Sequence, residues 1–164
     1  MKAAAQKVQA ALAALGLDRT VIELDVHART SQQAADALGV RVGQIAKSLV
    51  FTANGSPLLV IASGANRVDE ARLGRLMGAR IRRADPETVR QATGYAIGGV
   101  APLGHPAPLP VYIDRDLLQY EMIYAAAGVP ECVFPLTPAE LVRGTGGTVS
   151  DLKEMVATRR GAQA

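Results

Sequence analysis

The sequence predicts an α+β domain, on three observations. Helix-like and strand-like patterns follow one another without the steady β-α-β alternation of a doubly wound sheet. Two apolar runs are joined by a dipeptide typical of a tight hairpin, which indicates antiparallel strands. The chain has 164 residues, of which 49% are hydrophobic and 4% aromatic, so a substantial aliphatic core can form. Because no repeat or linker divides the sequence, residues 1–164 are expected to form one domain.

The first forty residues predict a helix, a short strand and a second helix. Apolar residues recur at helical spacing in residues 3–15, and the stripe comprises Ala4, Val8, Leu12 and Leu15. Residues 21–24 follow as a short strand. Thr30 and Gln33 then form a capping box at the start of the second helix. Glycine is expected to end both helices, at Gly16 and Gly39.

The clearest strand signal is a hairpin. Two apolar runs, 49–52 and 58–62, are joined through Asn54 and Gly55. Both of these residues tolerate the positive φ angles that a tight hairpin turn requires. The two runs are therefore expected to pair as antiparallel strands.

Short helices and strands are expected after the hairpin. A helix over residues 68–77 should turn Leu73, Leu76 and Met77 inward, and Asp85 should cap another helix over residues 86–92. The other expected elements are strands at 79–82, 111–113, 122–125 and 132–134 and a helix over 137–142. The segment 144–148 is rich in glycine and threonine and predicts a flexible connection, followed by a polar tail that allows one last short helix.

The composition argues against several common kinds of catalytic site. The chain has two histidines and one cysteine at no zinc-ligand spacing, so no zinc site is expected. The G-x-S-x-G turn of serine hydrolases and the P-loop lysine motif are missing too. A single cysteine fits a reducing compartment, and no apolar run approaches the roughly 20 residues of a membrane span. We therefore expect a cytoplasmic protein with no membrane partner, metal or cofactor.

Three single side chains each allow two interpretations. Cys132 lies in an apolar run, which favours a buried structural thiol over a nucleophile. His105 adjoins a glycine-rich loop and is either an ordinary surface histidine or a functional one. Lys47 stands at the entrance of a buried strand. Its ammonium group either reaches solvent or places one positive charge at the rim of a pocket, where a phosphate would bind.

Arginine is concentrated in one part of the chain. Seven arginines lie between positions 67 and 90, against four acidic residues. Solvated helix faces are the simpler interpretation of this excess, and an anionic partner is the alternative.

Six segments follow one another over about residues 30–140 and read TSQQAADALGV, QIAKSLVF, LLVIASGANRVD, ATGYAIGGVAPLG, LPVYIDRDL and IYAAAG. In this order they resemble the YbaK/prolyl-tRNA synthetase-associated editing domain family. The lysine of the family matches Lys47, and its G-x-x-x-P loop matches residues 98–102. Residues 129–131 depart from the segment that several members carry there, which leaves the particular amino acid substrate open.

The resemblance implies both a fold and an activity. The implied fold is a mixed, mostly antiparallel sheet that curls like a barrel and is flanked by helices. The implied activity is that of a trans-acting deacylase, which hydrolyses the ester of tRNA-Pro carrying a wrong Ala, Cys, Ser or Thr. Its partners would be aminoacyl-tRNA and a prolyl-tRNA synthetase, and no DNA is expected. Two alternatives stay open: a non-catalytic tRNA- or nucleotide-binding module of this fold, and a hydrolase of another small ester that uses Cys132.

The resemblance also assigns roles to residues. Backbone amides of the glycine loop would position the ester for attack by water, because glycine has no Cβ to keep a ligand away, and Lys47 would hold the phosphate of the terminal adenosine. The expected catalytic residues are Lys47, Gly98, Gly99, Val100 and Pro102. The expected substrate-binding residues, which would select by size, are Leu49, Ile61, Ser63, Tyr95, Ile97, Ala101 and Asp114. The expected contacts to tRNA, with a steep salt dependence, are Arg67, Arg72, Arg75, Arg80, Arg82 and Arg83.

Overall fold

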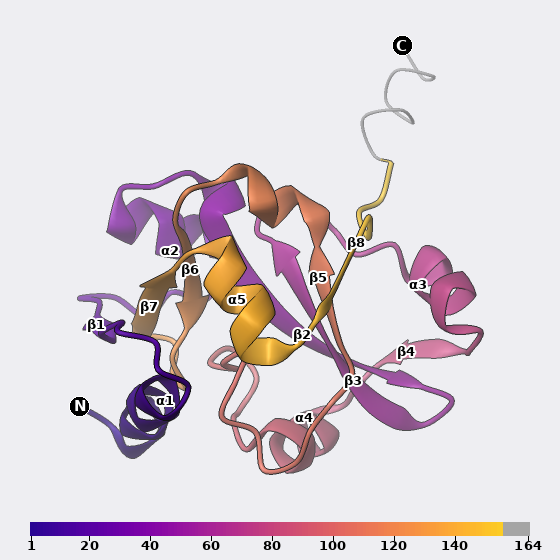
Figure 1. Cartoon of the computed structure of the whole chain (residues 1–164), viewed down its shortest axis with the longest axis horizontal. Helices are drawn as coiled ribbons and strands as arrows, with labels where there is room; N and C mark the ends of the chain where they lie inside the picture. The colour runs from indigo at the N-terminus through magenta and orange to yellow at the C-terminus, as the bar shows by residue number, and fades with distance from the viewer. Residues whose placement is uncertain (156–164) are drawn as a thin grey trace.

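An eight-stranded mixed sheet organises the computed structural model, which describes residues 1–155 (Figure 1). The strands are β1 (Ile22–Glu23), β2 (Ile45–Ala53), β3 (Ser56–Ser63), β4 (Ile81–Arg83), β5 (Val111–Asp114), β6 (Ile123–Ala126), β7 (Cys132–Leu136) and β8 (Thr148–Ser150). The α-helices are α1 (Ala3–Ala14), α2 (Ser31–Leu38), α3 (Glu70–Met77), α4 (Pro86–Thr93) and α5 (Pro138–Thr145), and two 3₁₀ helices are η1 (Val42–Gln44) and η2 (Arg115–Gln119).

Antiparallel and parallel pairs share the sheet. Its order is β1-β7-β6-β2-β3-β5-β8, and β4 pairs with β2 beside this path. The β1–β7, β6–β7, β2–β3 and β2–β4 pairs are antiparallel, whereas β2–β6, β3–β5 and β5–β8 are parallel. The α+β class and the mixed, mostly antiparallel sheet flanked by helices are thus confirmed. Because β1 and β8 end the path without pairing to each other, the sheet does not close into a barrel.

Local signals fixed several elements as expected. Thr30 and Gln33 form the capping box of α2, and Gly39 ends this helix at a φ of 70°. Asn54 and Gly55 make the β2–β3 turn with φ angles of 49° and 87°. The hairpin then pairs over the whole length of both strands, from Ala46 with Ser63 to Ala53 with Ser56.

Each face of the sheet packs a separate core. Helices α1, α4 and α5 and the glycine loop between α4 and β5 cover one face. Helix α3 covers the other, where Leu73 packs with Phe51 and Leu58. Side chains of a strand alternate between the two faces. Residues 49, 51 and 53 of β2 therefore turn toward the α3 core, whereas Ile45 packs against α2. The even residues of β2, such as Ala46 and Val50, turn toward the larger core.

Two leucines expected in the core are exposed. Leu15 is 44% exposed because it is the C-cap of α1, where the chain turns away, and Gly16 follows it at a φ of 73°. Leu76 is 49% exposed because the face of α3 that packs on the sheet carries Leu73 and the partly buried Met77. The inward placement predicted for Leu15 and Leu76 was wrong.

The glycine-rich segment 144–148 is not a flexible connection. Helix α5 continues through Thr145, and β8 begins at Thr148 and pairs with β5. A Cβ on Gly147 would lie 2.7 Å from Cδ1 of Ile113, so this glycine permits close packing on β5. Residues 151–155 form no helix, and the rest of the tail for which a short helix was considered lies outside the described residues.

After β8 the chain returns to the start of α3. The Asp69 amide donates to the Leu152 oxygen at 2.7 Å, and the Glu154 amide donates to the Arg67 oxygen at 2.9 Å. Within residues 1–155, the helices fall short of the length and apolarity that crossing a membrane requires.

Candidate active site

The candidate site occupies a notch in the sheet beside β2. On the edge away from β3, β6 pairs with residues 45–46 of β2, and β4 pairs with residues 51–53. Among the described strands, residues 47–50 thus pair with β3 alone. A cavity of about 400 Å³ opens at this gap. It is lined by residues of β2, β4, β6, β7, α2 and α4, of the segment before α2 and of the glycine loop.

Both faces of β2 contribute to the cavity wall, because the notch interrupts the sheet. Lys47 and Leu49 belong to the face that carries α3. Ser48 belongs with Ala46 and Val50 to the opposite face, against which the glycine loop packs. The cavity therefore joins a polar entrance, where Lys47 lies, to an aliphatic interior.

The glycine loop is held by main-chain packing. A Cβ on Gly99 would lie 2.6 Å from the main-chain oxygen of Gly128, at the turn between β6 and β7. Gly98 has a φ of 96°, which L side chains rarely adopt. The Gly99 amide donates to the Ala96 oxygen at 3.1 Å, so it is already used within the loop. In residues 1–155, the Gly98 and Val100 amides have no protein acceptor, and both residues line the cavity.

Two aromatic side chains support the loop from behind. His105 Nε2 lies 2.8 Å from the Ala101 oxygen, and the Tyr95 hydroxyl donates to the Leu103 oxygen at 3.2 Å. Burial lowers the pKa of His105, which favours the neutral ring, and raises the pKa of Tyr95 to about 12, which keeps its phenol a donor. Both residues therefore anchor the loop and do not line the cavity.

Cationic groups gather at the entrance. Lys47 Nζ donates to the main-chain oxygen of Asn66 at 2.7 Å. Burial is the largest cause that lowers the pKa of Lys47, and the nearby Arg67 and Arg83 lower it further, whereas Asp114 opposes them. An anion bound here would relieve the repulsion among the three cations, as a phosphate does.

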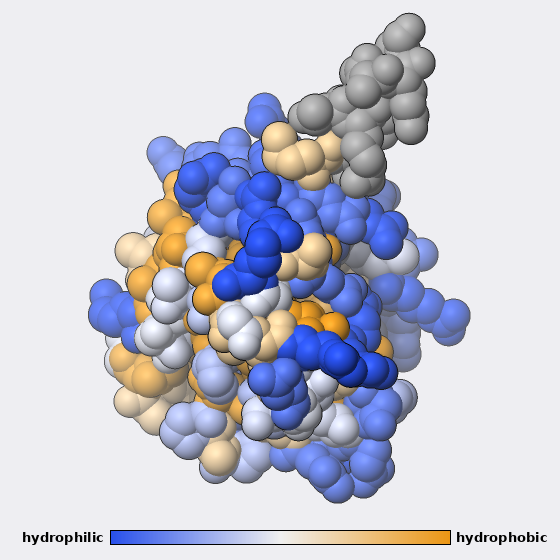
Figure 2. Space-filling view, turned by 90° about the vertical axis from the view of Figure 1, so that its right-hand side faces the viewer, coloured by the Kyte–Doolittle hydropathy of each residue, from blue (hydrophilic) through white to orange (hydrophobic). Residues whose placement is uncertain are grey.

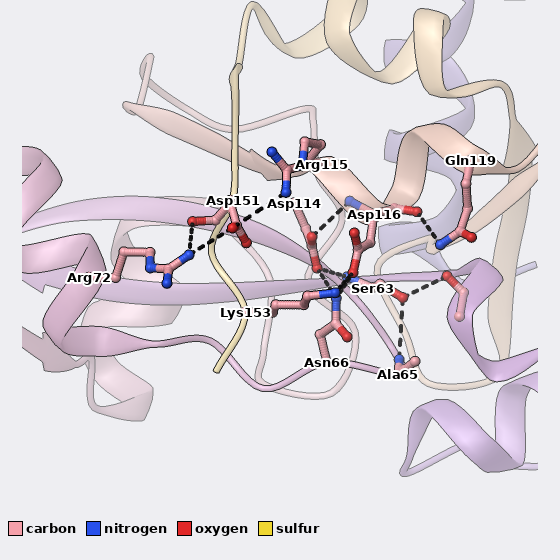
Figure 3. Close-up of polar contacts among 11 residues, drawn as sticks. Ser63, Ala65, Asn66, Arg72, Asp114, Arg115, Asp116, Gln119, Asp151 and Lys153 are labelled. Atoms are coloured by element: carbon pink, nitrogen blue, oxygen red, sulfur yellow. Dashed lines mark hydrogen bonds and ion pairs between the residues drawn. The ribbon is translucent and has the colours of Figure 1, made fainter. Parts of the chain in front are cut away.

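A polar network behind Lys47 fixes Asn66 (Figure 3). The buried carboxylate of Asp114 accepts hydrogen bonds from the Ser63 amide at 3.0 Å and from Asn66 Nδ2 at 2.9 Å. Asn66 Nδ2 also donates to Asp116 at 2.9 Å, and Lys153 Nζ lies 3.0 Å from the same Asp116 oxygen. The network thus ties together the ends of β3 and β5 and the segment after β8 (Figure 3).

The structure divides the expected catalytic and substrate-binding residues. Five of them line the cavity: Lys47, Leu49, Ile97, Gly98 and Val100. The others lie behind its wall: Ile61, Ser63, Tyr95, Gly99, Ala101, Pro102 and Asp114. Ile61 and Ala101 are core residues with no exposed surface, and Ser63 and Asp114 bond to each other. These residues therefore do not line the cavity, because the alternation along the strands and the packing of the loop direct their side chains into the core.

Some residues that line the cavity were not predicted from the sequence. Ser48 was overlooked beside Lys47, although the alternation along β2 places it on the opposite face. Tyr124, Val133 and the α2 residues Ser31 and Ala34 were missed because distant segments bring them to the notch. Arg83 was expected as a tRNA contact and also lines the cavity.

The predicted arginine surface lies around α3 and β4. Figure 2 shows hydrophilic residues over much of this face, with hydrophobic areas in the centre and on the left-hand side of the view. Arg67 has an 82% exposed side chain and a long ion pair of 3.8 Å with Glu154, and Arg72 forms an ion pair of 2.8 Å with Asp151. Arg75, Arg80 and Arg82 are exposed as well. Arg83 lies 5.5 Å from the ring of Phe51, which orients its guanidinium group beside the notch.

Cys132 is one of the residues that line the cavity, at the start of β7. It has no exposed surface, and burial, followed by the charges of Glu23 and Glu131, raises the pKa of its thiol. A nucleophilic cysteine needs the opposite, an accessible thiolate in a positive environment. The buried structural interpretation therefore fits this environment better.

The chain is similar to known proteins over most of its length. A family model described as "Aminoacyl-tRNA editing domain" matches residues 25–143. The protein YwhH of Bacillus subtilis is 34% identical over 125 residues, which cover 76% of this chain and 80% of YwhH. EbsC of Enterococcus faecalis, named "Putative Cys-tRNA(Pro)/Cys-tRNA(Cys) deacylase", is 26% identical over 125 residues, which cover 75% of this chain and 76% of EbsC.

A solved structure is similar throughout. The crystal structure described as "a putative trans-editing enzyme for prolyl tRNA synthetase" superposes with a TM-score of 0.91 and 48% identity. The match covers 94% of this chain and 99% of the other.

Proposed function

Because this chain belongs to the aminoacyl-tRNA editing domain family, we propose that it is a trans-acting deacylase of mischarged tRNA. Its substrate would be tRNA-Pro that carries a small wrong amino acid. The names of EbsC and of the similar crystal structure point to tRNA-Pro and to prolyl-tRNA synthetase. The observation that carries the proposal is the notch, which sets a cationic entrance beside a small aliphatic cavity.

The chemistry needs few side chains. A water molecule attacks the ester carbonyl carbon, and negative charge develops on the carbonyl oxygen. The amides of Gly98 and Val100, which have no acceptor within residues 1–155, would donate to this oxygen. The bond from the carbonyl carbon to the ribose oxygen then breaks. The ribose oxygen takes up a proton that derives from the water, and the neighbouring ribose hydroxyl assists the transfer. The products are the free amino acid and tRNA.

Lys47 would bind the phosphate of the terminal adenosine. Its ammonium is oriented by Asn66 and stands near Arg67 and Arg83, which favours an anion. Because Lys47 lies at the entrance, the phosphate would stay outside while the aminoacyl group enters the cavity. Selection would then rest on size, since a cavity of about 400 Å³ must also hold part of the adenosine.

The exposed arginines on α3 and β4 would contact the acceptor stem. Contacts to phosphates weaken steeply as salt increases, so KM for tRNA should rise with ionic strength. A prolyl-tRNA synthetase is the proposed second partner and would present the tRNA. Adding it should then lower KM for tRNA-Pro and leave KM for an unrelated tRNA unchanged.

A deacylation panel tests the proposal. The purified protein is incubated with tRNA-Pro, and with one unrelated tRNA, charged with Ala, Cys, Ser, Thr or Pro. We expect hydrolysis of at least one small aminoacyl group, none of Pro, and at least 100-fold less activity in Lys47→Ala at unchanged secondary structure. Binding of tRNA without any turnover would instead favour the non-catalytic binding module. Full activity of Lys47→Ala would remove the role assigned to this lysine.

A further inference from the structure

One polar atom in the cavity wall has no partner. The Oγ of Ser48 is buried, and no hydrogen-bond partner in residues 1–155 reaches it. Leaving a buried hydroxyl unpaired is destabilising, because the hydroxyl gives up its hydrogen bonds to water and gains none in the protein. Such an atom is rare in folded proteins unless a ligand or water completes it. The Ser48 hydroxyl therefore lowers the stability of the folded protein as long as it has no partner.

The Ser48 side chain lies in the cavity wall with its Oγ buried, so a substrate group would reach this hydroxyl after a small rotation of the side chain. Ser48 follows Lys47 in β2, so its side chain turns to the face opposite the ammonium group. There it shares the cavity wall with Ala46, Val50 and Val100, whose side chains offer no hydrogen bond. Ile61, which faces it on β3, has no exposed surface.

The charge of the cavity limits which chemical groups of a substrate could pair with Ser48. Within the described part of the chain, the charged lining residues are Arg29, Lys47 and Arg83, all of them cations. These cations disfavour burial of the substrate's α-ammonium group deep in the cavity. A neutral donor or acceptor fits the aliphatic interior better, because it loses less hydration there.

We propose that Ser48 is a specificity-determining residue whose hydroxyl pairs with the side-chain hydroxyl or thiol of the aminoacyl group. This inference rests on the proposed function and deepens it. Serine and cysteine would form the bond, whereas the methyl group of alanine would leave the Ser48 hydroxyl unpaired. Sites that hydrogen-bond a substrate hydroxyl discriminate strongly against analogues that lack it.

The test combines turnover with binding. Wild type and Ser48→Ala are assayed on Ser-, Cys- and Ala-tRNA-Pro. We expect kcat/KM for the Ser and Cys substrates to fall about 10-fold to 100-fold in the variant, as the loss of one such bond predicts. For the Ala substrate we expect a change of less than threefold. The melting temperature should stay the same or rise, because the substitution removes an unpaired hydroxyl.

Ser31→Ala is the matched control. Ser31 also lines the cavity, but it is partly exposed at the start of α2, where water can pair with its hydroxyl. This variant should leave the ratio of the Ser to the Ala rate unchanged. An equal loss for every substrate in Ser48→Ala, or no loss for any, would overturn the proposal.

A binding measurement separates this inference from the proposed function. Adenosine 5′-monophosphate that carries a 3′-amide-linked serine or alanine cannot be hydrolysed as an ester. Titration calorimetry should show tighter binding of the seryl analogue to wild type, and no such preference in Ser48→Ala. This result would support Ser48 even if the protein hydrolysed no ester. Equal affinities for the two analogues in wild type, or binding of neither, would overturn the inference.

Discussion

The ammonium group of Lys47 donates a 2.7 Å hydrogen bond to the main-chain oxygen of Asn66. Asn66 is itself clamped, because its side-chain amide donates to Asp114 and to Asp116 at 2.9 Å each. Asp114 is 2% exposed and also accepts from the Ser63 amide. The position of the cation at the entrance of the cavity therefore depends on a carboxylate that no substrate reaches.

Removal of the Asp114 carboxylate should cost both stability and activity. Asp114→Ala leaves the Ser63 amide without its acceptor and frees one side of Asn66. We expect the free energy of unfolding to fall by about 2–3 kcal/mol in urea titrations, since a buried donor loses its partner. Asp151→Ala is the control, because it breaks partly exposed ion pairs with Arg72 and Arg115 and should cost about 1 kcal/mol or less. Equal losses in the two variants would contradict the special role of Asp114.

The lowered pKa of Lys47 predicts that this lysine destabilises the folded protein, by an amount that depends on pH. Between that lowered pKa and 10.5, the unfolded chain holds more protons than the folded one, so the free energy of unfolding rises with pH. Lys47→Met should therefore be at least as stable as wild type at pH 7. Its advantage should shrink as the pH approaches 10.5. Urea titrations at several pH values measure this difference.

Lys153 provides the control of opposite sign. The hydrogen bond from Lys153 to Asp116 raises the pKa of Lys153 above 10.5. Lys153 therefore stabilises the fold fully below pH 10.5, and this stabilisation is lost as the pH rises through the raised pKa. Lys153→Met should therefore be no more stable than wild type, with a constant difference between pH 7 and 10.5. The same pH trend in both variants would contradict the assignment for Lys47.

Local patterns were sufficient for elements whose signals lie within a few residues. The capping box of Thr30 and Gln33 and the Asn54-Gly55 turn depend on hydrogen bonds and φ angles that neighbours in the sequence determine. Asp85 likewise caps α4, and its side chain accepts from the Thr88 amide. The family resemblance added the identity of Lys47 and of the glycine loop.

The notch could not be predicted from such patterns. It exists because β6 pairs with one end of β2 and β4 with the other, and both pairings join distant segments. The role of Gly99 was also hidden. Its missing side chain admits the main chain of Gly128, a residue 29 positions away, and its amide bonds within the loop. Composition showed an unusual loop there and could not show what packs against it.

Gly99→Ala should displace the glycine loop. The new Cβ would lie 2.6 Å from the Gly128 oxygen and 2.7 Å from Cα of Val129, and these main-chain atoms cannot shift cheaply. We expect a loss of about 1–3 kcal/mol in the free energy of unfolding. We also expect deacylation to fall at least 10-fold, because Gly98 and Val100 move with the loop.

Gly144→Ala is the matched control for this substitution. Gly144 lies in α5, and its nearest neighbour would be 3.4 Å from the new Cβ, so the space needs little adjustment. Alanine is the better helix former by about 1 kcal/mol, and the variant should be as stable as wild type or more so. Equal destabilisation by both substitutions would show that the close contact with Gly128 does not matter.

Cys132→Ala decides whether the thiol takes part in the reaction. Burial raises the pKa of this thiol, so at pH 7 it holds even less thiolate than an ordinary cysteine. We expect the variant to keep its deacylation rate within about threefold, and the folded wild type to resist alkylation by iodoacetamide. The lost sulfur should reduce the free energy of unfolding by about 1 kcal/mol, as removal of a small buried group does. A 100-fold loss of turnover in a folded variant would instead favour a cysteine hydrolase, since the loop amides do not depend on the thiol and the loss of one buried sulfur alters the cavity wall only slightly.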